Sequence, residues 1–386
     1  MIRKQCFFFL SLIFLFTHVT QAGVRVLMFH AHENLGYTEE AFREQMDFLA
    51  ENDFHTITPD QLLNWVENNH PLPIRPLLIT VDDSYLKVYT SMFPILYERN
   101  QIAVNFMPSS LMGGAHDHCS WEQIRVMEDI GNILTESHTK THPHLTQISY
   151  SEATREIEGS KIAIEANMPG KECLFFAYPY GDFDQEIISK CRDAGYRAAF
   201  TVIPGEVTHD SKPFRLPRYG VSDDDLEEFK GKIGFDQLPP SPPGDGWIID
   251  NTDPNFFSDA GWNSRSNIPE FFHTDCMVHF PDINETEARW AAYLPKQGLY
   301  RVHAWWPEKS ELDETAEYRI IHTEATETIT LDQSANGGQW NSLGDYYFSK
   351  DDPADVRLKG SFDAPVAADA IWFEPLTIEG NYWVFR

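Results

Sequence analysis

Short apolar runs alternate with helical patterns through the first half of the chain. These runs are VRVLMFH (24–30), RPLLITV (75–81), IAVNFMP (102–108), NILTES (132–137), CLFFAYP (173–179) and RAAFTV (197–202). Helical spacing and capping residues predict five helices. One contains residues 42–49, one begins at 59, one ends at 131, and two run near 184–194 and 224–232. Strands that alternate with helices predict a parallel sheet, either open or closed into a barrel.

The pattern changes after residue 235. Residues 236–246 concentrate proline and glycine without any periodicity, which predicts a linker. Beyond them, about eight short aromatic or β-branched runs, from MVHF (277–280) to AIWFEP (370–375), are separated by turn residues. We therefore expect an α/β domain over 23–235 and an antiparallel β-sandwich over 247–386.

The first 22 residues have the pattern of a secretory signal peptide. Arg3 and Lys4 form a positive region, an apolar stretch follows over 6–16, and Ala22 ends an A-x-A-like site. A membrane anchor is the alternative, but the stretch is much shorter than the roughly 20 residues that a spanning helix needs. We expect cleavage after Ala22, a secreted, periplasmic or envelope protein, and no integral membrane segment after cleavage.

The charge balance excludes some partners. The chain has 59 acidic and 30 basic residues, a net charge of -29 at pH 7. Nucleic acid and anionic lipid are poor partners for such a surface, whereas a neutral or cationic polymer is not repelled. Keeping the protein soluble is an equally simple reason for the acidity.

The cysteines do not form a metal-binding pattern. No CxxC spacing occurs among the four that follow the signal, which argues against a sulfur-based metal cluster. Cys173 and Cys191 could form a disulfide in an oxidising compartment, or both could be buried free thiols.

Polar clusters follow three of the expected parallel strands. Asp82 and Asp83 follow LLITV, the run HTKTH (138–142) follows NILTES, and PYG (179–181) follows LFFAY. The carboxyl ends of the strands of a parallel barrel form the face where active sites are built, so these clusters are expected to meet. Each cluster alone is more typical of a solvated turn or a capped loop, and only their joint placement favours a site.

One carboxylate and two imidazoles in these clusters match a catalytic metal site. Asp83, His138 and His142 form the donor set that holds catalytic zinc with its fourth position open. Asp82 is then free to accept a proton from an attacking water. The same donors accept Co²⁺, Ni²⁺ or Fe²⁺, so zinc is the first expectation among several divalent metals.

Three motifs, in this order, resemble the polysaccharide deacetylase family, carbohydrate esterase family 4. They are TVDDS (80–84), SHTKTHPHL (137–145) and FAYPYG (176–181), and the segment that begins at Val24 also resembles the start of this domain. The resemblance covers about 24–229. It implies a distorted (β/α) barrel and metal-dependent hydrolysis of N-acetyl groups on a glycan.

The resemblance also assigns roles by position. Asp82 matches the general base, and the backbone N–H of Tyr180 matches a group that holds the oxyanion. The matched metal ligands are Asp83, His138 and His142. Two positions depart from the pattern: Ser84 replaces the usual glycine, and the arginine that commonly precedes the proline–tyrosine motif is absent, so something else must orient Asp82.

The three motifs do not supply the general acid. The late leucine-x-histidine of the family is replaced by RLPRYGV (215–221), which contains no histidine. The branch that acts on poly-β-1,6-N-acetylglucosamine carries this histidine at the end of the first strand, where this chain has His30. His30 is therefore the candidate acid, with His32, His144 and His209 as rivals.

The second half has its own resemblance, to the golvesin or xanthan-lyase C-terminal-like module. The matching segments are IIDNTDPNFF (248–257), YRVHAWWP (300–307), GGQWNSLGDYYF (337–348) and ADAIWFEP (368–375). This resemblance implies a β-sandwich that binds or anchors glycan, and a purely structural appendage is the alternative.

Together these features predict a secreted, metal-dependent deacetylase of N-acetylglucosamine-containing polysaccharide. Peptidoglycan, chitin oligomers and glycan O-acetyl esters are alternative substrates. A different hypothesis is a non-catalytic glycan-binding protein that keeps the deacetylase fold.

Overall fold

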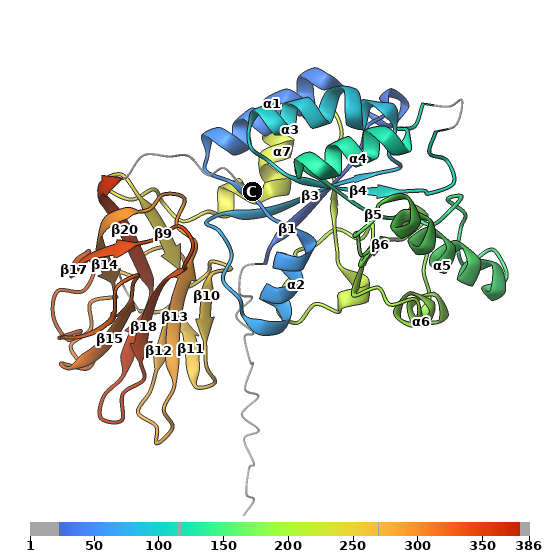
Figure 1. The fold of residues 1–386 in the computed structure, drawn as a ribbon. Coiled ribbons are helices and arrows are strands. Elements are labelled where there is room, and N and C mark those ends of the chain that lie inside the picture. Colours follow the sequence, from blue (N-terminus) through green and yellow to red (C-terminus); the bar gives the residue numbers. More distant parts are fainter. Residues whose placement is uncertain (1–22, 114–116, 269, 379–386) are drawn as a thin grey trace, which may run out of the picture.

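The computed structural model describes residues 23–113, 117–268 and 270–378, so the predicted signal segment lies outside the described residues. Figure 1 shows an α/β part, from β1 to the short helix η5 (Phe235–Gln237), beside a β part, from β9 to β20. Among the described helices, none combines the length and apolar character needed to cross a membrane.

The α/β part is built on one parallel sheet. Its strand order is β7-β6-β5-β4-β3-β1-β8, β2 joins β3, and every pairing is parallel. The strands are β1 (Arg25–His30), β2 (His55–Thr56), β3 (Pro76–Asp82), β4 (Ala103–Met107), β5 (Ile133–Ser137), β6 (Phe175–Ala177), β7 (Ala198–Phe200) and β8 (Tyr219–Gly220). The predicted distorted barrel with a β-rich second half is confirmed.

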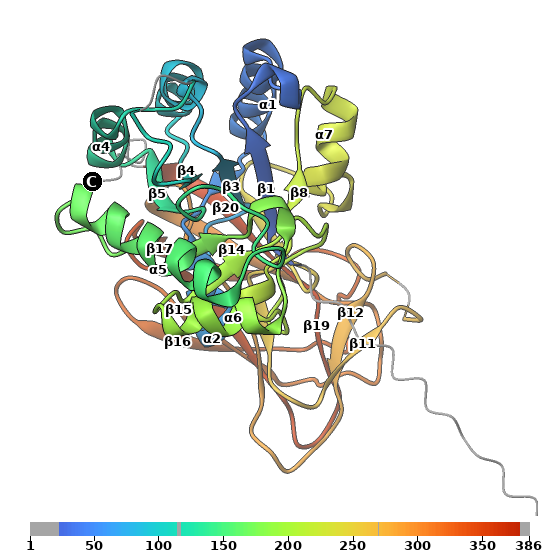
Figure 2. The ribbon, with the colours of Figure 1, turned by 90° about the vertical axis from the view of Figure 1, so that its right-hand side faces the viewer.

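Helices pack around this curved sheet (Figures 1 and 2). They are α1 (Glu39–Glu51), α2 (Pro59–Asn68), α3 (Phe93–Glu98), α4 (Trp121–Ile130), α5 (Tyr150–Asn167), α6 (Gln185–Asp193) and α7 (Leu226–Ile233). The short helical turns are η1 (Glu33–Leu35), the π-turn η2 (Val88–Met92), η3 (Pro179–Gly181) and η4 (Pro213–Arg215). The predicted capping boxes of α2 and α4 are both formed.

Alternate residues of each strand face two different cores. Leu77, Ile79 and Val81 of β3 belong to the large core under the helices. Leu78 of the same strand lies in a second core, with Val104 and Phe106 of β4, inside the curve of the sheet. Asp82 has the same parity as Leu78, so its side chain faces the inside of the curve.

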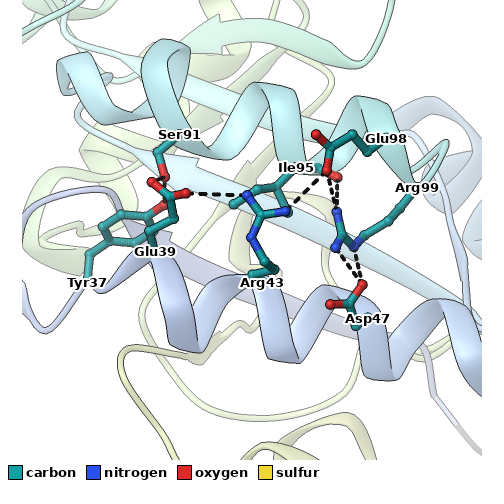
Figure 3. Close-up of polar contacts among 8 residues, drawn as sticks. All are labelled: Tyr37, Glu39, Arg43, Asp47, Ser91, Ile95, Glu98 and Arg99. Atoms are coloured by element: carbon teal, nitrogen blue, oxygen red, sulfur yellow. Dashed lines mark hydrogen bonds and ion pairs between the residues drawn. The ribbon is translucent and has the colours of Figure 1, made fainter.

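A ladder of ion pairs ties α1 to the helical segment before β4 (Figure 3). Arg43 of α1 lies between Glu39 and Glu98, at 3.3 and 3.1 Å. Arg99 donates from Nε to Asp47 Oδ1 at 2.6 Å and caps α3 by donating to the Ile95 carbonyl at 3.0 Å. These contacts fix the outer helical layer and lie away from the strand ends that carry the polar clusters.

The β part contains three antiparallel sheets. Their orders are β10-β13-β18-β15-β16, β11-β12-β19 and β17-β14-β20-β9. The strands are β9 (Trp247–Asp250), β10 (Phe256–Ser258), β11 (Trp262–Arg265), β12 (Cys276–His279), β13 (Glu287–Ala292), β14 (Gly298–Trp305), β15 (Ala316–Ile321), β16 (Thr326–Leu331), β17 (Asn341–Phe348), β18 (Ala354–Lys359), β19 (Val366–Ala368) and β20 (Ala370–Ile378). Eight of them were predicted; β9, β10, β11 and β19 were not.

The four cysteines that follow the signal segment are all buried free thiols. The possible disulfide between Cys173 and Cys191 is therefore not formed. Cys191 instead lies against the Tyr178 hydroxyl, and burial raises the pKa of its thiol to about 12. Buried cysteines of this kind act as small apolar side chains.

The two parts contact each other through a buried polar joint. Asn255 has no exposed surface; its Oδ1 accepts from the Leu72 N–H at 2.9 Å and its Nδ2 donates to the Pro73 carbonyl at 3.1 Å. Trp65 of α2 donates to the Pro254 carbonyl at 2.8 Å. Apolar residues of the β part, Phe257 and Ala291, complete the second core of the α/β part.

We expect Asn255→Ala to lower the free energy of unfolding by about 2–4 kcal/mol, because it leaves a buried N–H and a buried carbonyl without partners. Urea unfolding followed by fluorescence measures this loss. Asn263→Ala is the matched control, because the Asn263 amide bonds only within its own exposed turn. Equal stabilities of the two variants would contradict the role of this joint.

Candidate active site

Two predicted catalytic side chains lie at the ends of neighbouring strands. His30 ends β1 and Asp82 ends β3, and the two residues are paired in the parallel register. Side chains of paired residues point to the same face of a sheet. The imidazole of His30 is close enough to favour the ionised forms of both Asp82 and Asp83.

Arg218 holds Asp82 in a buried two-point ion pair. Arg218 Nη1 lies 2.7 Å from Asp82 Oδ1, and Nη2 lies 2.8 Å from Oδ2. The two side chains are 0% and 2% exposed. Arg218 also donates to Thr80 Oγ1 at 3.0 Å and to the Thr201 carbonyl at 2.8 Å, so the guanidinium is fixed on several sides.

This pair answers the question left by the missing arginine of the PYG motif. Arg218 orients Asp82 in place of that arginine. It lies in the segment RLPRYGV (215–221), which was notable in the sequence only because it lacks the family's late histidine. Burial alone would raise the pKa of Asp82, but the charge of Arg218, with His138, holds this pKa well below its ordinary value. Asp82 therefore stays an anion over the working pH range.

Asp83, His138 and His142 converge beside this pair. Their donor atoms lie within 4.8 Å of one another. Asp83 Oδ1 is 3.3 Å from His142 Nε2 and 3.7 Å from His138 Nε2, and the two Nε2 atoms are 3.1 Å apart. The structure thus brings together the three predicted metal ligands.

The protonation states of this cluster fit a bound cation. His138 Nδ1 lies 2.8 Å from the Ala177 carbonyl, which can only accept, so Nδ1 carries the proton and Nε2 presents its lone pair. Burial lowers the pKa of His138 to about 3 and also lowers that of His142, so both rings are neutral. Burial, and then the charge of Asp82, raise the pKa of Asp83 to about 6. Converging lone pairs and a strained carboxylate are the donor set that a divalent cation stabilises.

Left-handed backbone conformations shape the loops of this site. Asp83, Ser84, Thr139, His142 and Tyr180 all have positive φ, between 55° and 72°. Such conformations cost free energy in residues other than glycine and concentrate at functional sites. Ser84 keeps the turn that glycine makes in the family, and Asn105 fixes its hydroxyl with a 2.9 Å hydrogen bond.

Glu156 holds the HTKTH loop, and the sequence did not reveal it. One carboxylate oxygen accepts from the N–H groups of Lys140 and Thr141 at 2.9 and 2.8 Å, and the other accepts from the Thr141 hydroxyl at 2.7 Å. Glu156 belongs to α5, a helix that was not predicted. The Ser149–Glu152 capping box that starts this helix is the signal that would have found it.

Tyr180 lies at the mouth of the site. Its side chain is 56% exposed. The ring stacks on His144, with centroids 3.9 Å apart, and meets the edge of His142 at 4.5 Å. Tyr85, two residues after Asp83, lies between the rings of His32 and His118.

The rival histidines have other contacts. His32 Nδ1 accepts from the Asn34 N–H at 3.1 Å, which caps η1. His144 lies 3.7 Å from Asp182 under Tyr180. His209 packs against Trp65 and Phe257, at the contact with the β part, and does not join the cluster.

Comparisons with known families match both parts of the chain. Residues 69–199 match the family model described as polysaccharide deacetylase, and residues 247–375 match the Golvesin C-terminal domain.

Known proteins match about half of the chain. The Bacillus subtilis protein YxkH is 28% identical over 204 residues, which cover 52% of this chain and 72% of the relative. A poly-β-1,6-N-acetyl-D-glucosamine N-deacetylase of Staphylococcus epidermidis is 28% identical over 218 residues, with 53% and 75% covered. The solved Streptococcus pyogenes deacetylase PplD, in complex with acetate, shares the fold with a TM-score of 0.50 and 22% identity, over 54% of this chain and 99% of that one.

We expect Arg218→Met to destabilise the protein by about 3–5 kcal/mol, because it leaves a buried carboxylate without its cation. Arg197→Met is the control: Arg197 pairs with Asp60 and Glu67 at the surface, and this loss should cost at most about 1 kcal/mol. Urea unfolding of both variants measures the difference. If both variants lost the same free energy of unfolding, the buried Arg218–Asp82 pair would contribute no more to stability than a surface ion pair.

Proposed function

Because the chain joins a polysaccharide deacetylase domain to a Golvesin C-terminal domain, we propose that it is a secreted, metal-dependent hydrolase that removes N-acetyl groups from polysaccharide containing N-acetylglucosamine. One observation carries the proposal. A carboxylate fixed by Arg218 lies directly beside the Asp83–His138–His142 donor set, at the carboxyl ends of parallel strands.

Poly-β-1,6-N-acetylglucosamine is the preferred substrate. The support is the position of His30 at the end of β1 and the likeness to the Staphylococcus epidermidis enzyme. Peptidoglycan, chitin oligomers and glycan O-acetyl esters are the enzymatic alternatives. A glycan-binding protein without activity is disfavoured, because a pure binder needs neither a buried Arg218–Asp82 pair nor three converging ligands.

Asp83, His138 and His142 would hold the metal, and zinc is the first choice for this donor set. When bound, the cation supplies Lewis acidity, which polarises the acetamide carbonyl and makes water more acidic.

Asp82 is the general base of the reaction. It takes a proton from the attacking water as the oxygen adds to the acetamide carbon. Arg218 keeps the carboxylate ionised and limits its rotation, so the free lone pairs of its oxygens keep a fixed direction.

Tyr180 and His30 complete the reaction. The Tyr180 N–H donates to the oxyanion of the tetrahedral intermediate, from a turn in which Tyr180 has a left-handed φ of 60°. His30, as imidazolium, gives its proton to the amine nitrogen while the carbon–nitrogen bond breaks. Acetate and a free amine leave, with no covalent enzyme intermediate.

The division of the chain is also proposed here. Residues 1–22 would be removed on export, 23–235 form the catalytic domain, 236–246 form a linker, and 247–386 form the accessory domain. The Golvesin match over 247–375 supports the last boundary.

We propose that the accessory domain binds glycan through an aromatic cluster on the outer face of the β17-β14-β20-β9 sheet. The cluster consists of Phe272, Trp305, Trp340 and Trp372. Tyr300, Val302 and Ala304 of β14 face the core, so Trp305 faces outward. Trp340 lies 5.4 Å from Trp305 and 5.7 Å from Trp372. Phe272, Trp305 and Trp340 are partly exposed and Trp372 is buried beneath them; partly exposed aromatic rings suit stacking on sugar rings.

Acetate release tests the catalytic proposal. We expect the mature protein with zinc or cobalt to release acetate from poly-β-1,6-N-acetylglucosamine, and Asp82→Asn and His30→Ala to lose about 10²–10⁴-fold in kcat. Chelation should abolish activity, and metal content per protein should fall in His138→Ala.

The controls separate the alternatives. Asp129→Asn, at the exposed end of α4, should keep full activity, and His144→Ala tests the rival acid. An active Asp82→Asn would disprove the assigned base. Metal binding without acetate release from any acetylated glycan would favour the non-catalytic binder.

Glycan binding tests the accessory domain. Trp340→Ala should weaken binding to the polymer about 3–10-fold, because a lost aromatic contact costs about 0.5–1.5 kcal/mol. Affinity electrophoresis of inactive Asp82→Asn protein, with and without the second change, measures this. Phe362→Ala is the control, since Phe362 is exposed beside Lys359 and outside the cluster. If Trp340→Ala and Phe362→Ala weakened polymer binding equally, the aromatic cluster would not be the binding surface.

A further inference from the structure

Three buried oxygen atoms without hydrogen-bond partners occur at one place in the β part. They are Asp250 Oδ2, Asn251 Oδ1 and Asp369 Oδ1, on side chains that are 0%, 1% and 0% exposed. Asp250 ends β9, Asn251 follows it, and Asp369 lies between β19 and β20. Buried polar groups are normally satisfied, so three such oxygens need a physical reason.

One short segment, residues 272–275, contacts all three residues. The Phe272 N–H donates to Asp369 Oδ2 at 2.9 Å, and Asn251 Nδ2 donates to Asp275 Oδ1 at 2.8 Å. Between these positions, His273 Nδ1 lies 3.7 Å from Asp250 Oδ1. Asp250 is also paired with Ala370, the residue after Asp369, in the β9–β20 ladder.

The second polar atom of each of these side chains has a hydrogen-bond partner, which fixes the orientation of the side chain. Asp250 Oδ1 accepts from the Thr252 N–H at 3.0 Å and from the Thr252 hydroxyl. The Asn251 amide nitrogen is committed to Asp275, whose second oxygen accepts from Ser264. In each of Asp250, Asn251 and Asp369, one polar atom has a fixed partner and the remaining oxygen can only accept.

The charges at this place are not balanced by the protein. Within the described residues, Asp250, Asp275 and Asp369 have no ion pair with lysine or arginine, and His273 is the one basic contact of Asp250. Burial, and then the charge of Asp250, raise the pKa of Asp369 well above its ordinary value. Asp355, which is buried in the neighbouring sheet, has the basic partners that buried carboxylates usually have, because Arg289 and Arg357 both pair with it.

We propose that Asp250, Asn251 and Asp369 bind a hard divalent cation of the Ca²⁺ class. A buried carboxylate is paired with a base, coordinated to a metal or protonated; here His273 contacts Asp250 alone, and a bound cation would satisfy the carboxylates of Asp250 and Asp369 together. Carboxylate and amide oxygens select Ca²⁺ or a similar ion over zinc, which prefers the nitrogen donors of the Asp83 cluster. The site is independent of the proposed catalysis.

Such an ion would join three separate segments of the β part. It would link the end of β9, the β19–β20 junction and, through their hydrogen bonds, the segment 272–275. Phe272 of this segment packs against Trp305 and Trp340. The cation would therefore order one wall of the aromatic cluster.

Terbium luminescence tests the site in the full mature protein after chelation. Trp290 Nε1 donates to the Asp369 carbonyl at 3.2 Å, so a bound Tb³⁺ ion lies near an indole that can sensitise its emission. We expect saturable Tb³⁺ emission that Ca²⁺ displaces and Zn²⁺ does not. At about 100 times its Kd, Ca²⁺ should raise the Tm of the β part by about 5–10 °C.

Variants assign the signal to these residues. Asp369→Asn and Asp250→Asn should each lose most of the emission, whereas Asp355→Asn and His138→Ala should keep it. If either carboxylate variant fails to fold, the wild-type titrations with Tb³⁺ and Ca²⁺ still decide the question. Emission that persists in folded Asp369→Asn, or the absence of both emission and a Ca²⁺-dependent Tm, would overturn the proposal and leave buried water or a shared proton as the partner of these oxygens.

Discussion

The buried ion pair between Arg218 and Asp82 is the interaction on which the candidate active site depends. It places a permanent anion inside the curve of a parallel sheet, where an unpaired carboxylate would take up a proton. Thr80 and the Thr201 carbonyl fix the arginine in turn, so strand β3 and the residue that follows β7 both support one side chain. The neighbouring carboxylate of Asp83 faces His138 and His142 instead, so the two adjacent aspartates have different partners.

The loops around this pair store strain that the rest of the fold must offset. Thr139 and His142 bend through left-handed conformations to bring two imidazoles together, and Glu156 holds the N–H groups between them. Rigid strands behind the loops and a long helix beside them supply that support. The geometry of the site therefore depends on several strands, loops and a helix at the carboxyl end of the barrel, and no single sequence motif contains it.

The sequence predicted the strands and the clusters well, because buried parallel strands are continuous apolar runs and polar residues at their ends stand out. It missed α5 because small or polar residues, Ala153 and Ser160, form much of its buried face, which blurs the apolar period. It also missed the partner of Asp82, since Arg218 lies 136 positions away and a charged residue between apolar neighbours has no pattern of its own. The short strand β9 ends in polar residues whose burial only the fold explains.

The joint between the two parts has a mechanical consequence. Residues 72–74 bond to Asn255, pair with Tyr293 and contribute Ile74 to the core of the β part, and they lead within two residues into β3, which ends at Asp82. In the proline-rich segment 236–246, Gln237 Oε1 accepts from Arg25 of the barrel at 2.8 Å, Leu238 packs against the barrel core, and the Asp245 carbonyl accepts from Trp372 of the β part at 3.1 Å. A pull on the β part, as from a tethered polymer, therefore reaches the barrel along two paths: through this linker, and through residues 72–74 into β3, which ends at Asp82.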